Sequence, residues 1–194
     1  MDKKDAFAER KRAQEEDYFR KREAELVEKM RRKTELERQR QLLAETTGIT
    51  DEKALQQLQD WGYKPDTIPL LYIAPLLQVA WAEGNVSGGE RDLILEAARS
   101  HSIAEGSPAY AELSLWLNVR PSEDFLEKSL RLLKLLMQQL PMESRVMQKR
   151  ELIANCTKVA EATGSLMGFI SASKRVSKEE RHTLTRIVQE LEEI

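Results

Sequence analysis

A run of 45 residues without glycine or proline, from Asp2 to Thr46, constrains the fold more than any other feature of this sequence. It consists mostly of Ala, Glu, Lys, Arg, Gln and Leu, which have the highest helix propensities. Acidic and basic residues recur four positions apart, and each such pair stabilises an isolated helix by a few tenths of a kcal/mol. These pairs are Glu16–Arg20, Asp17–Lys21, Glu25–Lys29 and Glu28–Arg32. The run therefore predicts a single helix that ends before Thr46-Thr47-Gly48, with the glycine as its stop.

Such a helix would be longer than a small domain is wide. At 1.5 Å per residue, about 45 residues extend roughly 65 Å. We therefore expect the helix to project from the rest of the chain, to pair with another chain, or to remain partly disordered until it is bound.

Charge is concentrated in this N-terminal run. Residues 1–50 carry 14 Lys/Arg and 12 Asp/Glu, whereas residues 51–194 carry 17 and 21. Neither part is basic enough to predict nucleic-acid binding, and no apolar run approaches the ~20 residues of a membrane span.

The compartment can be inferred from two further features. The charged N-terminus does not fit a signal peptide. The single cysteine, Cys156, is expected to be a small buried residue in a reducing compartment. We therefore expect a soluble, cytoplasmic protein.

From Thr50 onward, amphipathic segments alternate with turn signals, and no alternating strand pattern occurs. The segment LEKSLRLLKLLMQQL, for example, places apolar residues at i, i+3, i+4 and i+7, as a core-facing helix does. We predict helices at about residues 51–60, 67–83, 87–102, 108–118, 123–139, 142–163, 165–173 and 177–193. The fold class is therefore all-α. The expected division is an extended helix at 1–46, a linker with a short helix at 47–66, and a helical domain at 67–194.

An internal repeat relates two parts of this helical domain. The segment AEGNVSGGERDLI at 82–94 aligns with ASKRVSKEERHTL at 172–184, an offset of 90 residues. Both copies contain a capping box, in which a serine is followed three residues later by a glutamate. The boxes are Ser87 with Glu90 and Ser177 with Glu180, and each is preceded by a valine. We therefore predict helix starts at both serines and two related halves.

Catalysis finds no support in the sequence. There is no nucleophile–base constellation and no phosphate loop, and His101 and His182 lie far apart on polar helices. We therefore expect neither an enzyme nor a cofactor. Four large aromatic residues are expected to pack in the core rather than to form a ligand site: Trp61, Tyr63, Trp81 and Trp116.

The N-terminal helix carries an aromatic flank. At 100° per residue, Phe7, Tyr18, Phe19, Leu26 and Met30 fall within about 140° of the helical wheel. This flank is too sparse for a core of its own and too irregular for a coiled-coil seam. It is typical of a helix that inserts into a groove of a partner.

A series of residues in this helix has a characteristic spacing. Its members are Phe7, Arg10, Ala13, Glu15, Glu16, Tyr18, Phe19, Arg20, Arg22, Glu25, Val27 and Met30. The series resembles the inhibitory helix of the mitochondrial ATP synthase inhibitor protein family, which shows a Phe, a basic pair, an acidic cluster and a Tyr-Phe-Arg core. The similarity covers about residues 5–33.

This resemblance implies a partner and a mechanism. In the family, the helix enters the interface between a catalytic and a noncatalytic subunit in the head of the F-type ATP synthase and blocks ATP hydrolysis. By resemblance, Tyr18, Phe19 and Met30 would fill apolar pockets, and Phe7 would face the central shaft. Charge-assisted contacts would come from Glu15, Arg20, Arg22 and Glu25. Such a partner would bring the chain to the membrane periphery.

A second resemblance concerns the helical domain. The segment VAWAEGNVSGGERDLILEAA is similar to the motif of TerB-like (tellurite-resistance) domains, in which an Ala-Asp-Gly-x-Val/Ile-x-x-x-Glu pattern links two helices. The resemblance implies an all-helical bundle with two related halves over about residues 66–194. Some members carry acidic residues suspected of metal binding, and the corresponding residues here are Glu83, Asn85 and Glu90. One copy supplies only two carboxylates, so we expect no bound metal.

An alternative function remains open at this level. The chain would be a TerB-like stress-response scaffold, and its N-terminal helix would only mediate oligomerisation, as in a homodimer, or bind a different partner. Inhibition and scaffolding differ in what the aromatic flank contacts, which the sequence alone does not decide.

Overall fold

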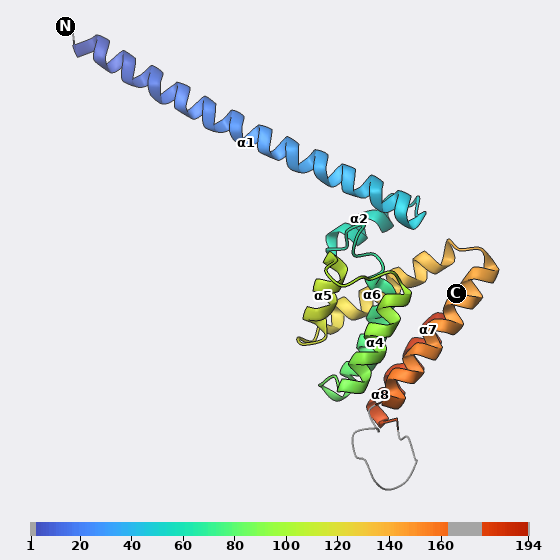
Figure 1. Ribbon diagram of the computed structural model, residues 1–194. Coiled ribbons are helices and arrows are strands. Elements are labelled where there is room, and N and C mark those ends of the chain that lie inside the picture. The colour runs from blue at the N-terminus through green and yellow to red at the C-terminus, as the bar shows by residue number, and fades with distance from the viewer. Residues whose placement is uncertain (1–2, 163–175, 194) are drawn as a thin grey trace. The chain divides into compact units, whose positions relative to one another are not determined.

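The computed structural model describes the backbone of residues 3–162 and 176–193, and the side chains of residues 15–162 and 176–193. These ranges contain α-helices and one short 3-10 helix and no strand, so the all-α prediction is confirmed. The chain divides into two compact units, Met1–Leu42 and Leu43–Ile194. Figure 1 shows the helices in chain order. They are α1 (Lys3–Thr47), α2 (Glu52–Asp60), α3 (Leu70–Ala80), η1 (Trp81–Glu83), α4 (Gly88–Ser100), α5 (Pro108–Trp116), α6 (Glu123–Gln138), α7 (Met142–Ala162) and α8 (Lys178–Glu192).

The positions of these helices agree closely with the sequence pattern. Each described helix begins within about three residues of its predicted start, and the predicted segment 67–83 is divided between α3 and η1. The predicted helix at 165–173 lies outside the described residues.

The end of α1 has the expected glycine. Gly48 has φ +72°, a left-handed conformation that a glycine adopts without strain, and its N–H donates to the carbonyl of Ala44 at 2.8 Å. The hydroxyl of Thr47 donates to the carbonyl of Leu43 at 2.7 Å. Leu43 and Ile49 belong to the hydrophobic core of the second unit. That unit therefore includes the last turn of the long helix.

Helix α2 also contributes to the core of the second unit, through Ala54, Leu55 and Leu58. Asp51 caps its N-terminus by accepting a hydrogen bond from the N–H of Lys53. Its C-terminus closes with paired hydrogen bonds from Gly62 to Gln59 and from Tyr63 to Leu58, the Schellman arrangement. Residues 47–66 are therefore part of the compact unit.

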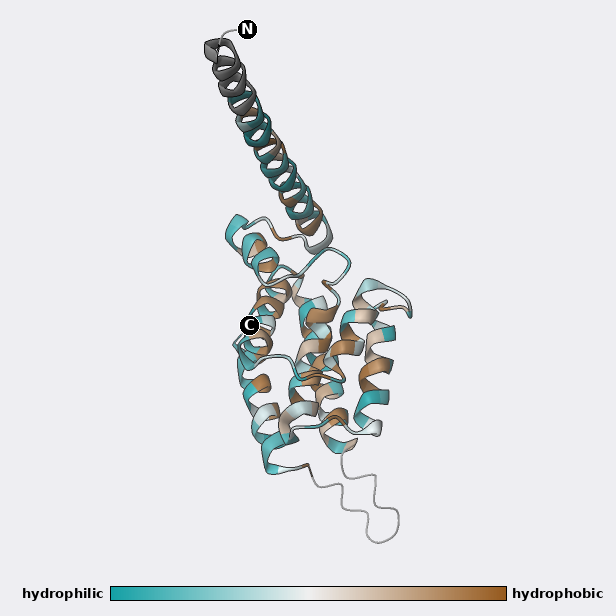
Figure 2. Ribbon diagram, turned by 90° about the vertical axis from the view of Figure 1, so that its left-hand side faces the viewer, coloured by the Kyte–Doolittle hydropathy of each residue, from teal (hydrophilic) through white to brown (hydrophobic). Residues whose placement is uncertain are grey.

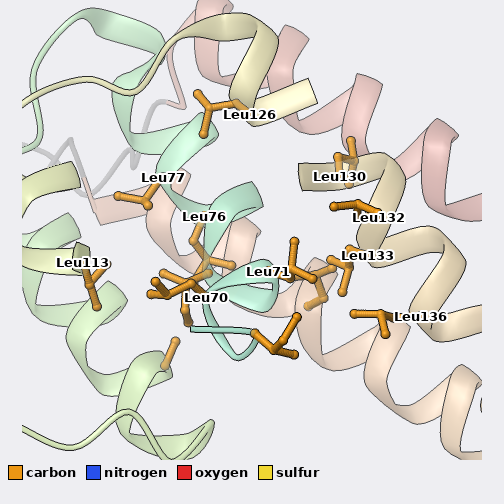
Figure 3. Packing of buried hydrophobic residues seen from close by; sticks show 14 of the residues in the cluster. Leu70, Leu71, Leu76, Leu77, Leu113, Leu126, Leu130, Leu132, Leu133 and Leu136 are labelled. Carbon is orange, nitrogen blue, oxygen red and sulfur yellow. The ribbon is translucent and has the colours of Figure 1, made fainter. Parts of the chain in front are cut away.

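Helix α3 lies at the centre of the second unit and contacts α4, α5, α6, α7 and α8. Its sequence, LLYIAPLLQVA, is apolar around the whole circumference, which is the pattern of a helix buried on all sides. Ten of its eleven residues are buried. Figure 3 shows leucines of α3, among them Leu71 and Leu76, packed between those of α5 and α6. The hydropathy colouring in Figure 2 likewise concentrates apolar residues between the helices of this unit.

Both predicted capping boxes are present. Ser87 accepts from the N–H of Glu90 at 3.3 Å while the Glu90 carboxylate accepts from the N–H of Ser87 at 2.7 Å. Ser177 and Glu180 form the same pair of bonds, at 3.1 and 2.8 Å. The two glutamates are 1 % and 0 % exposed, so the caps satisfy carboxylates that burial would otherwise destabilise. The repeat thus starts α4 and α8 in the same way.

Candidate partner-binding helix

Every sequence-predicted partner-binding residue lies on α1. Those with described side chains are all exposed: Glu15, Tyr18, Phe19, Arg20, Arg22, Glu25, Val27 and Met30. Phe7 and Arg10 belong to the helix, but their side chains lie outside the described residues. The exposed fractions are 56 % for Tyr18, 63 % for Phe19 and 66 % for Met30. Large apolar side chains this exposed are available for contact with another molecule.

The two aromatic rings form a local unit. Tyr18 and Phe19 meet edge to face, with centroids 5.9 Å apart and planes at 71°. One turn later, Arg22 Nη1 donates a hydrogen bond of 2.8 Å to the Tyr18 hydroxyl. The guanidinium and the phenol are therefore held together on one side of the helix. This side presents two rings and a cation to whatever it contacts.

The same helix also carries ion pairs between neighbouring turns. The predicted pairs Asp17–Lys21 and Glu28–Arg32 are present, each at 3.0 Å. Arg20 lies 3.4 Å from Asp17, one residue away from the acid that the i,i+4 pattern assigned to it. All of these side chains are at least half exposed, so each pair contributes only a few tenths of a kcal/mol. The pairs favour the helical conformation. Because each pair is weak, its two side chains can separate at little cost and form contacts with another molecule instead.

The acidic residues that the second resemblance suggested do not come together as a metal site. Glu90 is buried within its capping box, whereas Glu83, the last residue of η1, and Asn85, in the turn that follows, are exposed. Across the described residues, no group of three or more His, Cys, Asp or Glu side chains could hold a metal ion. The motif does connect two helices, because η1 ends at Gly84 with φ +88° and α4 begins after Ser87.

Three titratable groups of the second unit, Cys156, His101 and Tyr72, are buried or half-buried. Burial raises the pKa of the Cys156 thiol to about 12, and the side chain is fully enclosed, as expected from the sequence. The His101 ring stacks on Tyr72 with centroids 4.7 Å apart. Burial lowers the pKa of His101, although the Glu151 carboxylate acts in the opposite direction. The Tyr72 hydroxyl in turn donates to Gln148 on α7 at 2.9 Å.

The four large aromatic residues divide into two groups. Tyr63 and Trp81 are buried, in agreement with the prediction that they are core residues. Trp61 and Trp116 are half-buried and pack at the edge of the core. Together with Tyr63 they line a cavity that the sequence did not reveal, because its walls come from separate segments, residues 61–70, residues 108–116 and Phe125.

No protein-family model, curated protein or solved structure matches the chain. The two resemblances therefore rest on the quoted motifs alone. In the part of the chain that the structure describes, no helix has the length and apolar character needed to cross a membrane.

Proposed function

We propose that residues 5–33 of α1 are a docking segment that inserts into a subunit interface of a larger partner, and that this partner is the catalytic head of an F-type ATP synthase. The chain would then be a protein inhibitor of ATP hydrolysis. The observation that carries the proposal is the exposure of Tyr18, Phe19 and Met30 on a helix that is rich in charged residues. Burial of such side chains at an interface is the usual source of binding energy in helix-in-groove recognition.

The arrangement of side chains fits insertion rather than attachment to a flat surface. The rings of Tyr18 and Phe19 lie about 100° apart around the helix, and Met30 extends the same flank by three turns. Val27 lies on the other side and is also exposed. A groove that contacts both sides would bury all four residues. The resemblance supplies the identity of such a groove, the interface between a catalytic and a noncatalytic subunit.

The proposed mechanism is steric. Hydrolysis by a rotary ATPase requires its catalytic interfaces to open and close in turn, and a rigid helix wedged into one of them prevents that movement. Interface contacts to the charged residues Glu15, Arg20 and Glu25 would be charge-assisted and would fix the orientation of the helix. The helical unit that follows would anchor or regulate the inhibitor. This function would hold the chain in the cytoplasm beside the membrane.

The test is an ATP hydrolysis assay with the purified catalytic head of the enzyme from the same organism. The intact chain is expected to inhibit hydrolysis in a saturable manner. The double variant Tyr18→Ala/Phe19→Ala should weaken inhibition at least a hundredfold, because two anchoring rings are lost.

Leu36 provides the matched control. It is an exposed apolar residue of the same helix, 51 % accessible, but it lies beyond the segment that carries the resemblance. Leu36→Ala should therefore inhibit as well as the unaltered chain. The proposal fails if the intact chain does not inhibit at concentrations far above that of the enzyme, or if the Tyr18/Phe19 double variant inhibits equally well.

A second function is favoured by one observation. Exposed leucines continue past residue 33, at Leu36 and Leu42, where an inhibitory segment would not need them. A helix that pairs with a second copy would use the whole series. In that case, sedimentation would detect a dimer, Leu26→Ala and Leu36→Ala would weaken it to similar extents, and hydrolysis would be unaffected. The chain would then act as a scaffold.

A further inference from the structure

The second unit contains a cavity of about 380 Å³ between the α2–α3 connection, α5 and the first turn of α6. Its volume falls in the range of small-molecule sites, roughly 300–1,000 Å³. Four aromatic side chains contribute to its wall: Trp61, Tyr63, Trp116 and Phe125. Among the four phenylalanines, four tyrosines and three tryptophans of the chain, this is an unusual concentration in one place.

Three of these rings are held in place by contacts with one another and with Ser129. The rings of Tyr63 and Phe125 stack with centroids 5.9 Å apart, and Trp116 meets Phe125 edge to face at 5.0 Å. The Tyr63 hydroxyl lies 2.7 Å from Ser129 Oγ, which donates to the carbonyl of Phe125. These contacts fix the rings before any ligand arrives, so binding would not have to order them.

The charges at the cavity are mostly negative. Glu112 of α5 and Asp66 of the α2–α3 connection line it, against one base, Lys64. Neither carboxylate forms an ion pair with another residue of the described ranges. Burial raises the pKa of Tyr63, and the nearby charge of Glu112 raises it further. The field of Glu112 therefore reaches the aromatic wall.

Aromatic faces and unpaired carboxylates together select for an organic cation. A metal ion would require additional oxygen, nitrogen or sulfur ligands, and the described residues provide no cluster of three. The π faces of Trp and Tyr, by contrast, attract ammonium groups and also contact their alkyl substituents. The protein itself contains one such contact, since Lys128 Nζ lies 5.5 Å from the centroid of the Trp61 ring.

We propose that this cavity binds an alkylated ammonium ion, with the rings of Trp61 and Trp116 against its alkyl groups and Glu112 as its counter-charge. The ligand is either a free quaternary ammonium compound or the methylated lysine side chain of another protein. Both present the same chemistry to the cavity, and the experiment separates them.

Titration of the full chain with choline tests the proposal, with 3,3-dimethyl-1-butanol as an uncharged compound of the same shape. The indole N–H signals of the three tryptophans provide the readout by NMR. Choline should shift the Trp61 and Trp116 signals in a saturable manner, and the uncharged compound should bind about tenfold more weakly or not at all.

A second titration distinguishes the two sources of the ligand. A peptide with trimethyllysine is compared with its unmodified form. Tighter binding of the modified peptide than of choline indicates a protein ligand, and the reverse indicates a free small molecule.

Three variants complete the design. Glu112→Gln and Asp66→Asn should each lower choline affinity severalfold while leaving the urea midpoint of unfolding unchanged. Glu143→Gln, at an exposed position on α7, should have no effect on binding. The proposal is wrong if choline produces no saturable shift up to tens of millimolar, if the uncharged compound binds as well as choline, or if neither cavity variant weakens binding.

Discussion

The two units of this chain use the same secondary structure in opposite ways. In Met1–Leu42, large apolar side chains such as Leu26 are about half exposed, whereas in Leu43–Ile194 a residue of the same type, Leu71, is completely buried. The first unit depends on helix propensity and on contacts between neighbouring turns. The second depends on burial around α3, which is cooperative because each helix covers the others. Helix α1 therefore leaves its large apolar side chains exposed, whereas the second unit encloses most of its own.

Ion pairs show the same contrast. Along α1 they join residues three or four positions apart on the exposed surface. The second unit has local pairs as well, such as Lys128–Asp124, but others join helices distant in sequence: Lys134 of α6 lies 2.7 Å from Glu190 of α8. Arg186 of α8 bonds to both Glu123 and Glu127 of α6. The Lys134 hydrogen bond lowers the pKa of Glu190 and outweighs its partial burial. The local pairs stabilise a helix, and the long-range pairs stabilise the packing of two.

The largest expected effect contrasts two leucine-to-alanine substitutions. Leu71→Ala removes a fully buried side chain from α3 and should lower the free energy of unfolding by about 2–5 kcal/mol. Leu26→Ala on α1 should change it by less than about 0.5 kcal/mol. Urea denaturation followed by tryptophan fluorescence measures the free energy of unfolding of the second unit in each variant, because all three tryptophans lie in that unit. Equal effects of the two substitutions would contradict the contrast between the units.

A smaller effect is expected at the caps of the second unit. Ser87→Ala and Ser177→Ala each remove the hydroxyl that accepts a backbone N–H, and each should cost about 0.5–2 kcal/mol. Ser100→Ala serves as the control, since its exposed hydroxyl bonds only to the carbonyl of Glu96 within the same helix. Chemical denaturation gives the three values. If Ser100→Ala proves as costly as the two cap variants, the capping boxes are not what stabilises these helix starts.

The smallest expected effect concerns pH. Because burial lowers the pKa of His101 in the folded state, the unfolded chain takes up a proton at a higher pH than the folded one. Stability should therefore fall as the pH drops from the unfolded value of 6.5 toward the lower folded value. His101→Gln should reduce this slope as the pH falls through 6.5, and pH-dependent urea denaturation measures it. An unchanged slope in His101→Gln would show that the stacked ring remains free to ionise.

Local patterns were sufficient to predict the helices and their ends. The stop at Gly48 and the two serine caps follow from hydrogen bonds between residues at most four apart, which a sequence displays directly. The continuous apolar run of α3 likewise indicates a buried helix.

Contacts across the fold could not be predicted in the same way. The hydrogen bond between Tyr63 and Ser129 spans 66 residues, and the one from Trp81 to the carbonyl of Trp116 spans 35. No spacing rule connects such positions, because their meeting depends on how the helices pack. The aromatic cavity was missed for this reason. The sequence was sufficient to place the candidate residues on one helix, α1. The Arg22–Tyr18 hydrogen bond was not predicted, because it depends on side-chain rotamers, which a helical wheel does not represent.

The burial of Cys156, the only cysteine of the chain, has a consequence for labelling experiments. With the only thiol protected by the fold, a cysteine introduced at an exposed position of α1 can be labelled selectively with a maleimide dye or a spin label. In the unaltered chain, the rate at which Cys156 reacts with a disulfide reagent then reports how often the second unit opens around it. The burial of this one thiol thereby allows selective labelling of the long helix, and the reactivity of the thiol measures the opening rate of the second unit.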